Sequence, residues 1–215
     1  MKLYGNDFSP NSNKARFGLN AMGVDYEFQT VNLAGGEQRT EAFTSINPVG
    51  RVPALVDGDF MIFESNAILR YVAEKIKSPL YPQELKKHAL VNQWLDFCSI
   101  HIGGAMTKMY FNTIIYKFVN AQRDENSYNE GRKFLTDFCK IIEGQLSKGA
   151  YVCGGELTLA DIGLLALLDP CEVVGFDLAA FPKIAAWRKT LQAQAFYQKV
   201  FPSFAEFLGA AMAKV

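Results

Sequence analysis

The sequence predicts a chain of two parts, an α/β domain followed by an all-helical domain. Residues 2–76 alternate short strand patterns with helical ones, residues 77–83 (KSPLYPQ) form a linker with two prolines, and the rest carries helical periodicity only. Composition and pattern change together at the linker, so we place the first domain at 1–79 and the second at 85–215. A length of 215 residues with 49% hydrophobic side chains suffices for a substantial core.

The predicted elements of the first part alternate between strand and helix. Gly23 ends the first helix, and the sequence Asp-Gly-Asp at 57–59 is a strong turn signal between two apolar runs. The resulting order β-α-β-α-β-β-α is the thioredoxin-like arrangement. The predicted strands are residues 2–5, 26–31, 52–56 and 60–63; the predicted helices are a segment with Ala15, Phe17, Leu19 and Met22 on one face, a short one at 41–44, and one opening at 64–65 with Ile68, Leu69, Tyr71 and Val72 on one face.

Helices alone are predicted for the second part. Gly103 and Gly104 lie inside the first helical pattern, where each costs roughly 1 kcal/mol and can mark a bend or a close backbone approach. The four predicted helices span residues 84–118, 127–146, 159–168 and 181–201.

The charge balance and the cysteines exclude several classes of function. Lys and Arg number 22, as do Asp and Glu, so the chain has no overall charge that would attract nucleic acid or an anionic membrane. We expect no signal peptide, and the apolar stretch at 162–168 is too short to cross a bilayer. The four cysteines lack metal-ligand spacing, so we expect reduced thiols in a cytoplasmic protein and no metal.

The first segment with chemical content is residues 8–14 (FSPNSNK), between the first strand and the first helix. A thioredoxin would hold its reactive cysteines here, but this chain has none, which disfavours a dithiol reductase. A hydroxyl at a helix N-terminus can instead donate to a bound thiolate, whose negative charge the helix end favours. A free thiol has a pKa of about 8.5, and each unit of depression corresponds to roughly 1.4 kcal/mol. The alternative is that Ser9 and Asn11 are ordinary loop and capping residues.

The second segment, residues 47–55 (NPVGRVPAL), places Pro53 at the start of a strand. We predict a cis Val52-Pro53 peptide, which leaves the Val52 backbone groups free to pair with a peptide-like ligand as an added strand. The alternative is an edge-strand proline.

The third segment, residues 63–68 (FESNAI), opens a helix. We expect Ser65 as its N-cap, with the helix end binding a carboxylate, and Glu64 accepting from an amino group. Capping alone explains Ser65 but leaves Glu64 unexplained. Together the three segments provide a hydroxyl for a thiolate, a backbone pairing site and a site for an amino-acid zwitterion, and glutathione needs all three.

In this order and spacing, the three segments closely resemble the soluble glutathione transferases, and specifically the phi-like branch, which uses an early serine. Residues 157–161 (LTLAD) resemble that family's buried capping box, with Thr158 at the N-cap and Asp161 at N3. Residues 181–187 (FPKIAAW) resemble the usual start of a late helix in the family, so the likeness covers nearly the whole chain. The resemblance implies glutathione transferase architecture, a homodimer, glutathione as co-substrate and an apolar electrophile as partner.

The resemblance also implies roles for individual residues. Ser9 would activate the glutathione sulfur, with Asn11 or Ser12 sharing or replacing that role. Lys14 could add positive potential, but we expect a solvated surface lysine. Position 38 is Gln where the phi branch often has His, and position 66 is Asn where Arg is common. The glutathione-binding residues would be Asn11, Gln38, Arg39, Arg51, Val52, Pro53, Glu64 and Ser65.

The electrophile site is predicted from a Met-rich and aromatic stripe that borders the cleft in this family. We assign Met106, Tyr110 and Phe111 to it, and Met109 belongs to the same stripe; core or dimer contacts are the alternative for each. The predicted function is conjugation of glutathione to hydrophobic electrophiles. A glutathione-dependent isomerase or peroxidase is the enzymatic alternative, and a ligand carrier or scaffold the non-enzymatic one.

Overall fold

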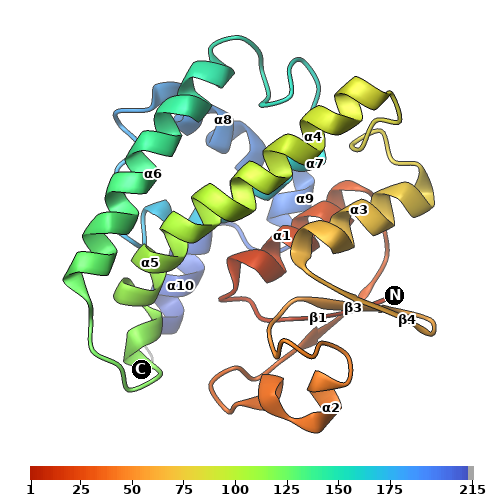
Figure 1. Cartoon of the computed structure of the whole chain (residues 1–215), viewed down its shortest axis with the longest axis vertical. Coiled ribbons are helices and arrows are strands. Elements are labelled where there is room, and N and C mark those ends of the chain that lie inside the picture. Colours follow the sequence, from red (N-terminus) through yellow and green to blue (C-terminus); the bar gives the residue numbers. More distant parts are fainter. Residues whose placement is uncertain (213–215) are drawn as a thin grey trace.

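A computed structural model describes residues 1–212 (Figure 1), so the last three residues of the predicted helical domain lie outside the described residues. The first part is a four-stranded sheet with helices on both faces, as predicted. Its elements are β1 (Lys2–Gly5), α1 (Pro10–Ala21), β2 (Glu27–Thr30), a 3-10 turn (Glu37–Arg39), α2 (Glu41–Thr44), β3 (Ala54–Asp57), β4 (Phe60–Phe63) and α3 (Ser65–Ile76).

The sheet has the strand order β2-β1-β3-β4, with β1 parallel to β2 and the other neighbours antiparallel. The predicted hairpin is confirmed, since Gly58 has a φ of +66° in the turn between β3 and β4. Helices α1 and α3 cover one face through a core that includes Leu3, Leu55 and Ile68. The short α2 covers the opposite face, where Phe43 packs.

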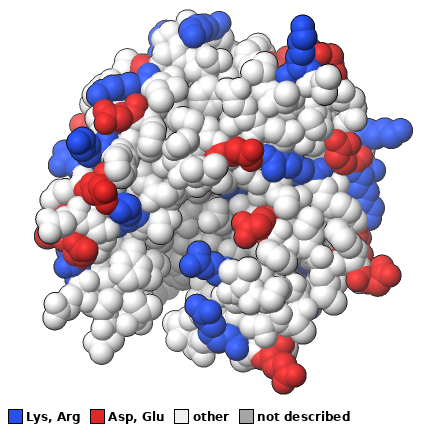
Figure 2. All heavy atoms as spheres, in the orientation of Figure 1, with Lys and Arg blue, Asp and Glu red and all other residues white. Residues whose placement is uncertain are grey.

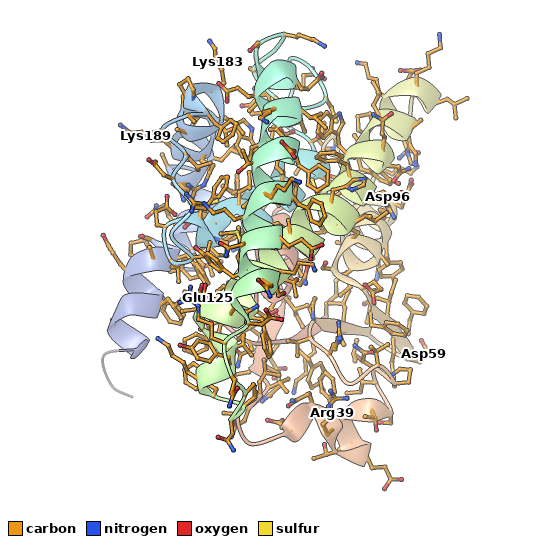
Figure 3. All side chains as sticks on the ribbon, turned by 60° about the vertical axis from the view of Figure 1, so that its left-hand side comes forward. Arg39, Asp59, Asp96, Glu125, Lys183 and Lys189 are labelled. Carbon is orange, nitrogen blue, oxygen red and sulfur yellow. The ribbon has the colours of Figure 1, made fainter. Side chains whose placement is uncertain are left out.

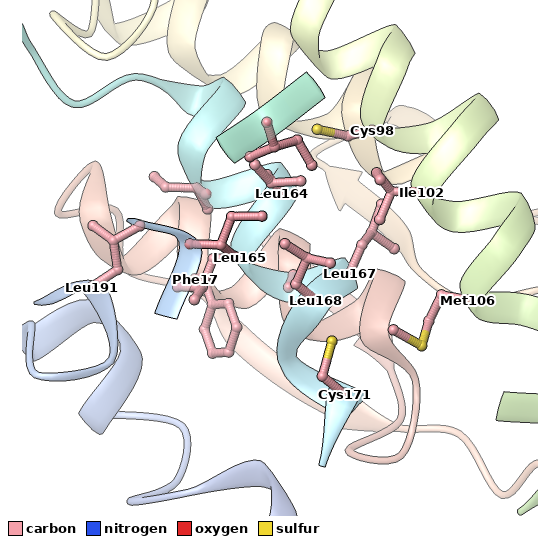
Figure 4. Packing of buried hydrophobic residues seen from close by; sticks show 14 of the residues in the cluster. Phe17, Cys98, Ile102, Met106, Leu164, Leu165, Leu167, Leu168, Cys171 and Leu191 are labelled. Atoms are coloured by element: carbon pink, nitrogen blue, oxygen red, sulfur yellow. The ribbon is translucent and has the colours of Figure 1, made fainter. Parts of the chain in front are cut away.

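The second part consists of helices packed around α7 (Figure 4). Every residue of α7 is buried, and this helix packs against both α1 and α4, so it joins the two parts through one apolar core. No helix within residues 1–212 has the length and apolarity needed to cross a membrane. The helices are α4 (Leu85–Phe97), α5 (Gly103–Thr113), α6 (Glu125–Leu146), α7 (Leu159–Leu168), α8 (Pro182–Gln192), α9 (Ala195–Gln198) and α10 (Phe204–Met212).

The predicted single helix over 84–118 is wrong in detail. Five residues with π-helical hydrogen bonding (Cys98–Ile102) separate α4 from α5, and a 3-10 turn (Ile115–Lys117) follows α5. Gly103 ends the π segment, and a Cβ there would lie 3.6 Å from the side chain of Leu167 in α7. At that distance a Cβ would be in ordinary van der Waals contact, so the glycine marks the change from π to α geometry and not a close approach to α7.

The end of the chain also differs from the prediction. The expected helix over 181–201 is two helices, α8 and α9, because the chain leaves helical geometry at Gln194, whose ψ is 149°. The further helix α10 was not predicted. By contrast, the capping box of α7 is confirmed, with Thr158 and Asp161 in reciprocal hydrogen bonds.

Architecture of the candidate glutathione site

A cleft of about 890 Å³ lies between the sheet domain and the helical domain, and Figure 2 shows the hollow on one face of the molecule. The first turns of α1 and α3 and the turn before β3 form one side. Residues of α4, the π segment and α5 form the other. Nine of the predicted site residues line the cleft: Asn11, Arg51, Val52, Pro53, Glu64, Ser65, Met106, Tyr110 and Phe111. Ser9, Gln38 and Arg39 do not line it.

Ser9 is the N-cap of α1, directly before the cleft-lining Pro10 and Asn11. Its hydroxyl oxygen accepts a hydrogen bond from the Ser12 N–H at 3.2 Å, which satisfies one donor of the helix end. Among residues 1–212, its own hydroxyl hydrogen has no acceptor. A half-buried O–H at the positive end of a helix is therefore available to a bound anion.

The loop before Ser9 is held from several sides. The Asn6 side chain donates to the Val31 carbonyl and accepts from the Phe8 N–H. Across the domain interface, the Tyr110 hydroxyl donates to the Phe8 carbonyl at 2.9 Å. The peptide that leads into Ser9 is thus fixed by both domains, which pre-organises the hydroxyl.

The two alternatives to Ser9 occupy different places. Ser12 is fully buried and its hydroxyl oxygen accepts from the Asn6 N–H, so it faces the protein interior. Asn11 is exposed in the cleft, and its side-chain oxygen accepts from the Ser65 hydroxyl at 3.3 Å. Asn11 therefore connects the first turn of α1 to that of α3.

The predicted cis peptide between Val52 and Pro53 is confirmed. Strand β3 starts only at Ala54, whose partners are Tyr4 and Phe63. In the part of the chain that the structure describes, the Val52 N–H and carbonyl form no hydrogen bond. An extended ligand in the cleft can therefore pair with them.

The N-terminus of α3 faces the same cleft. The expected N-cap at Ser65 is wrong: Glu64 is in the capping position, with a φ of +70° and no side-chain cap, and Ser65 is the first helical residue. A non-glycine residue at such a φ is held there by its surroundings and is common at binding sites. Since the first turn of a helix has no internal partners for its N–H groups, those of Ser65 to Ala67 remain for an anion.

Gln38 and Arg39 lie beside the cleft rather than in it. Their 3-10 turn packs against Gly50, where φ is +64° and a Cβ would lie 2.9 Å from the Gln38 carbonyl and 3.3 Å from Arg39 Nη1. Gly50 directly precedes Arg51, which is exposed and lines the cleft. Because the turn that contains Arg39 (Figure 3) packs against Gly50, Arg39 and Arg51 belong to segments that lie side by side. The buried Oε1 of Gln38 has no partner among the described residues.

On the helical side of the cleft, α5 contributes the predicted Met-rich and aromatic stripe. Met106 and Tyr110 are only 2% and 6% exposed, whereas Phe111 is 37% exposed and reaches furthest into solvent. Burial raises the pKa of Tyr110, so it remains a neutral hydroxyl whose hydrogen goes to Phe8. Met109 is fully buried and belongs to the core.

Several cleft residues were not predicted. Arg70 of α3 and Asp96 of α4 (labelled in Figure 3) form an ion pair at 2.6 Å across the domain boundary, and both line the cleft. The expectation for Lys14 is wrong: this side chain is fully buried, with its ammonium 3.2 Å from Asn66 Oδ1 and 3.4 Å from Ser99 Oγ. The hydrophobic pattern of α1 does not indicate that Lys14 is buried, because its burial depends on contacts with α3 and the π segment.

Comparison with known proteins agrees with this geometry. Residues 1–74 match the family model of the glutathione S-transferase N-terminal domain, and residues 103–195 match that of the C-terminal domain. Among curated relatives, glutathione S-transferase D7 of Drosophila melanogaster is 35% identical over 192 residues, covering 88% of this chain and 83% of the relative. Glutathione S-transferase F10 of Arabidopsis thaliana, a phi-class protein, is 35% identical over 162 residues, covering 74% of this chain and 75% of that protein.

Solved structures show the same likeness. The structure of glutathione S-transferase I from maize in complex with an atrazine glutathione conjugate matches with a TM-score of 0.84 and 30% identity, covering 95% of this chain and 97% of that one. That protein holds a glutathione conjugate. Both family models, the relatives and the cleft between the two domains lead to one conclusion: the chain belongs to the glutathione S-transferase family and resembles its phi-class members.

Proposed function

We propose that this protein binds glutathione in the cleft, stabilises its thiolate through the Ser9 hydroxyl, and directs the sulfur onto an apolar electrophile. The observation that supports this most directly is the Ser9 hydroxyl itself. It caps α1, its hydrogen is free among the described residues, and a loop fixed by both domains holds it. A hydrogen bond to a thiolate is charge-assisted and lowers the pKa of the thiol.

The remainder of the tripeptide fits the groups around Ser9. The unpaired backbone of Val52 would bind the cysteinyl part as a short added strand. The first turn of α3 would take the γ-glutamyl carboxylate, with Glu64 accepting from the amino group. At the other end, Gln38, Arg39 and Arg51 would bind the glycine carboxylate. These assignments place the thiol between the two ends, on the side of Ser9.

The reaction would follow from this placement. The thiolate attacks an electrophilic carbon, a C–S bond forms, and the leaving group departs with its electron pair. Met106 and Phe111 would hold the electrophile by apolar contact on the α5 side of the cleft. Holding both reactants in one cleft removes the entropic cost of their encounter, and thiolate stabilisation supplies the nucleophile at neutral pH.

We also propose a homodimer, because large apolar side chains remain exposed in a monomer. They lie on β4 and along α4, the π segment and α6, where the rings of Phe97, His101 and Phe138 pack in tilted and edge-on orientations with their centroids within 6 Å of one another. Sedimentation velocity should give twice the monomer mass; a monomer at micromolar concentration would contradict this. The exposed apolar residues of this surface include Phe60, Met61, Ile100, Phe134 and Ile141.

A cytoplasmic location is proposed as well. The four cysteines are free thiols, and three of them, Cys98, Cys139 and Cys171, are buried. Free thiols persist in reducing compartments. Cell fractionation would test this, and recovery from an oxidising compartment would contradict it.

The function is tested by calorimetric titration with glutathione together with conjugation to a chloronitrobenzene. Saturable binding and enzymatic conjugation are expected. Binding without conjugation would favour the isomerase, peroxidase or carrier alternatives, and failure to bind glutathione would refute the proposal. Ultraviolet absorbance of the bound thiolate, followed against pH, should show a pKa below that of free glutathione.

A further inference from the structure

Lys14 is a buried cation with uncharged partners. Lysines are rarely fully buried without a counter-ion, yet Lys14 is 0% exposed, and among the described residues its ammonium hydrogen-bonds only to the Asn66 and Ser99 side chains. Within residues 1–212, no carboxylate lies within ion-pair distance of it. An uncompensated buried charge is costly to the folded protein, and that cost is offset only when a group of opposite charge binds near it.

The partners of Lys14 belong to the cleft wall. Asn66 and Ser99 both line the cleft, Asn66 in the first turn of α3 and Ser99 in the π segment. The Asn66 amide accepts from Lys14 and donates to the Leu95 carbonyl at 2.8 Å and to Ser99 Oγ at 2.9 Å. The side chain of Asn66 thus separates the Lys14 ammonium from the cleft, and its hydrogen bonds hold it in that place.

The ammonium of Lys14 lies next to the N-terminus of α3, because its partner Asn66 is in the first turn of that helix. Ser65, Asn66 and Ala67 line the cleft with the N–H groups of that first turn, which already favour an anion. Burial lowers the pKa of Lys14 to about 8, so the ammonium stays mostly protonated at neutral pH. Of the nearby titratable groups, Cys98 and Glu64 favour the ammonium and Arg70 opposes it; Arg70 is itself paired with Asp96.

We propose that Lys14 is a positioning residue for glutathione: acting through Asn66, it supplies the buried positive charge that holds the γ-glutamyl carboxylate at the N-terminus of α3. This inference rests on the proposed function. The proposal also accounts for the asparagine at position 66. Since Lys14 of α1 supplies the positive charge of the site, an arginine at position 66 is not needed.

The test compares two ligands on three proteins. The ligands are glutathione and its analogue that lacks the α-carboxylate of the γ-glutamyl residue, and the proteins are wild type, Lys14→Met and the control Lys75→Met. Lys75 is at the other end of α3, paired with Asp57, so the control removes the same net charge. Lys14→Met should bind glutathione about tenfold more weakly and the analogue less than twofold more weakly. Lys75→Met should leave both affinities within twofold.

If the role of Lys14 is only structural, Lys14→Met should bind glutathione and the analogue more weakly by the same factor, and that result would overturn the proposal. Should Lys14→Met fail to fold, as judged by circular dichroism, Lys14→Gln provides the second variant. It removes the positive charge and keeps a polar group that can hydrogen-bond to Asn66 and Ser99, so it should show the same selective loss of glutathione binding. An unchanged preference for glutathione over the analogue would refute the proposal. Wild-type protein that binds neither ligand would instead refute the proposed function.

Discussion

Replacing Tyr110 with phenylalanine removes one hydroxyl that joins the helical domain to the loop carrying Ser9. The ring stays in its apolar surroundings, and the Phe8 carbonyl loses the donor at 2.9 Å. A carbonyl left without its partner in a half-buried place costs about 1–2 kcal/mol. The freed loop must be ordered again in the transition state, so the lost hydrogen-bond energy adds to the activation free energy. Each 1.4 kcal/mol of it corresponds to about a tenfold loss of rate. We therefore expect kcat/KM for conjugation to fall about five- to tenfold.

The helical domain offers a matched control in Tyr128. Its hydroxyl donates to the Val174 carbonyl at 2.7 Å, also half-buried, and it does not line the cleft. Tyr128→Phe should lose similar stability in urea unfolding, about 1–2 kcal/mol, with kcat/KM within twofold of wild type. The reasoning is refuted if both variants lose activity equally, or if Tyr110→Phe loses stability and keeps full activity.

Three further predictions concern the fold and the electrophile. Asp161→Asn should lower the free energy of unfolding by about 3 kcal/mol, because the buried carboxylate accepts from Val152, Thr158 and Trp187; an unchanged urea midpoint contradicts this. Burial raises the pKa of Asp161 to about 6, so the free energy of unfolding of wild type should rise by about 1 kcal/mol as the pH falls from 7 to 5. The difference in unfolding free energy between wild type and Asp161→Asn should therefore grow over that range, and a difference that shrinks would contradict the prediction. Phe111→Ala should raise KM for an apolar electrophile severalfold with KM for glutathione unchanged, and equal effects on both would remove Phe111 from the electrophile site.

The α/β half was predictable from local signals. The hairpin followed from Asp-Gly-Asp, the end of α1 from Gly23, and the cap of α7 from Thr158 and Asp161, since each depends on residues within a few positions. Ser9 at a helix N-terminus was predictable for the same reason. Local signals were thus sufficient for the order of strands and helices in the first domain and for the position of Ser9, but not for the N-cap of α3, which is Glu64 and not Ser65.

Features that depend on packing between distant segments were not predictable. The π segment keeps the apolar pattern of an ordinary helix, and no local signal in the sequence separates it from α4 and α5. Lys14 looks like a surface lysine in the sequence, and its burial depends on residues 66 and 99, more than 50 positions away. The hydroxyl of Tyr110 likewise finds its acceptor 102 residues away, so its role beside Ser9 needed the structure.

The central claim is that the Ser9 hydroxyl stabilises the glutathione thiolate, and Ser9→Ala tests it most directly. The measurement is kcat/KM for conjugation of glutathione to a chloronitrobenzene, with glutathione affinity measured in parallel by calorimetry. We predict at least a tenfold loss of kcat/KM with affinity changed less than threefold, together with a rise in the pKa of the bound thiol. A variant that keeps both the wild-type rate and the lowered thiol pKa would contradict the account.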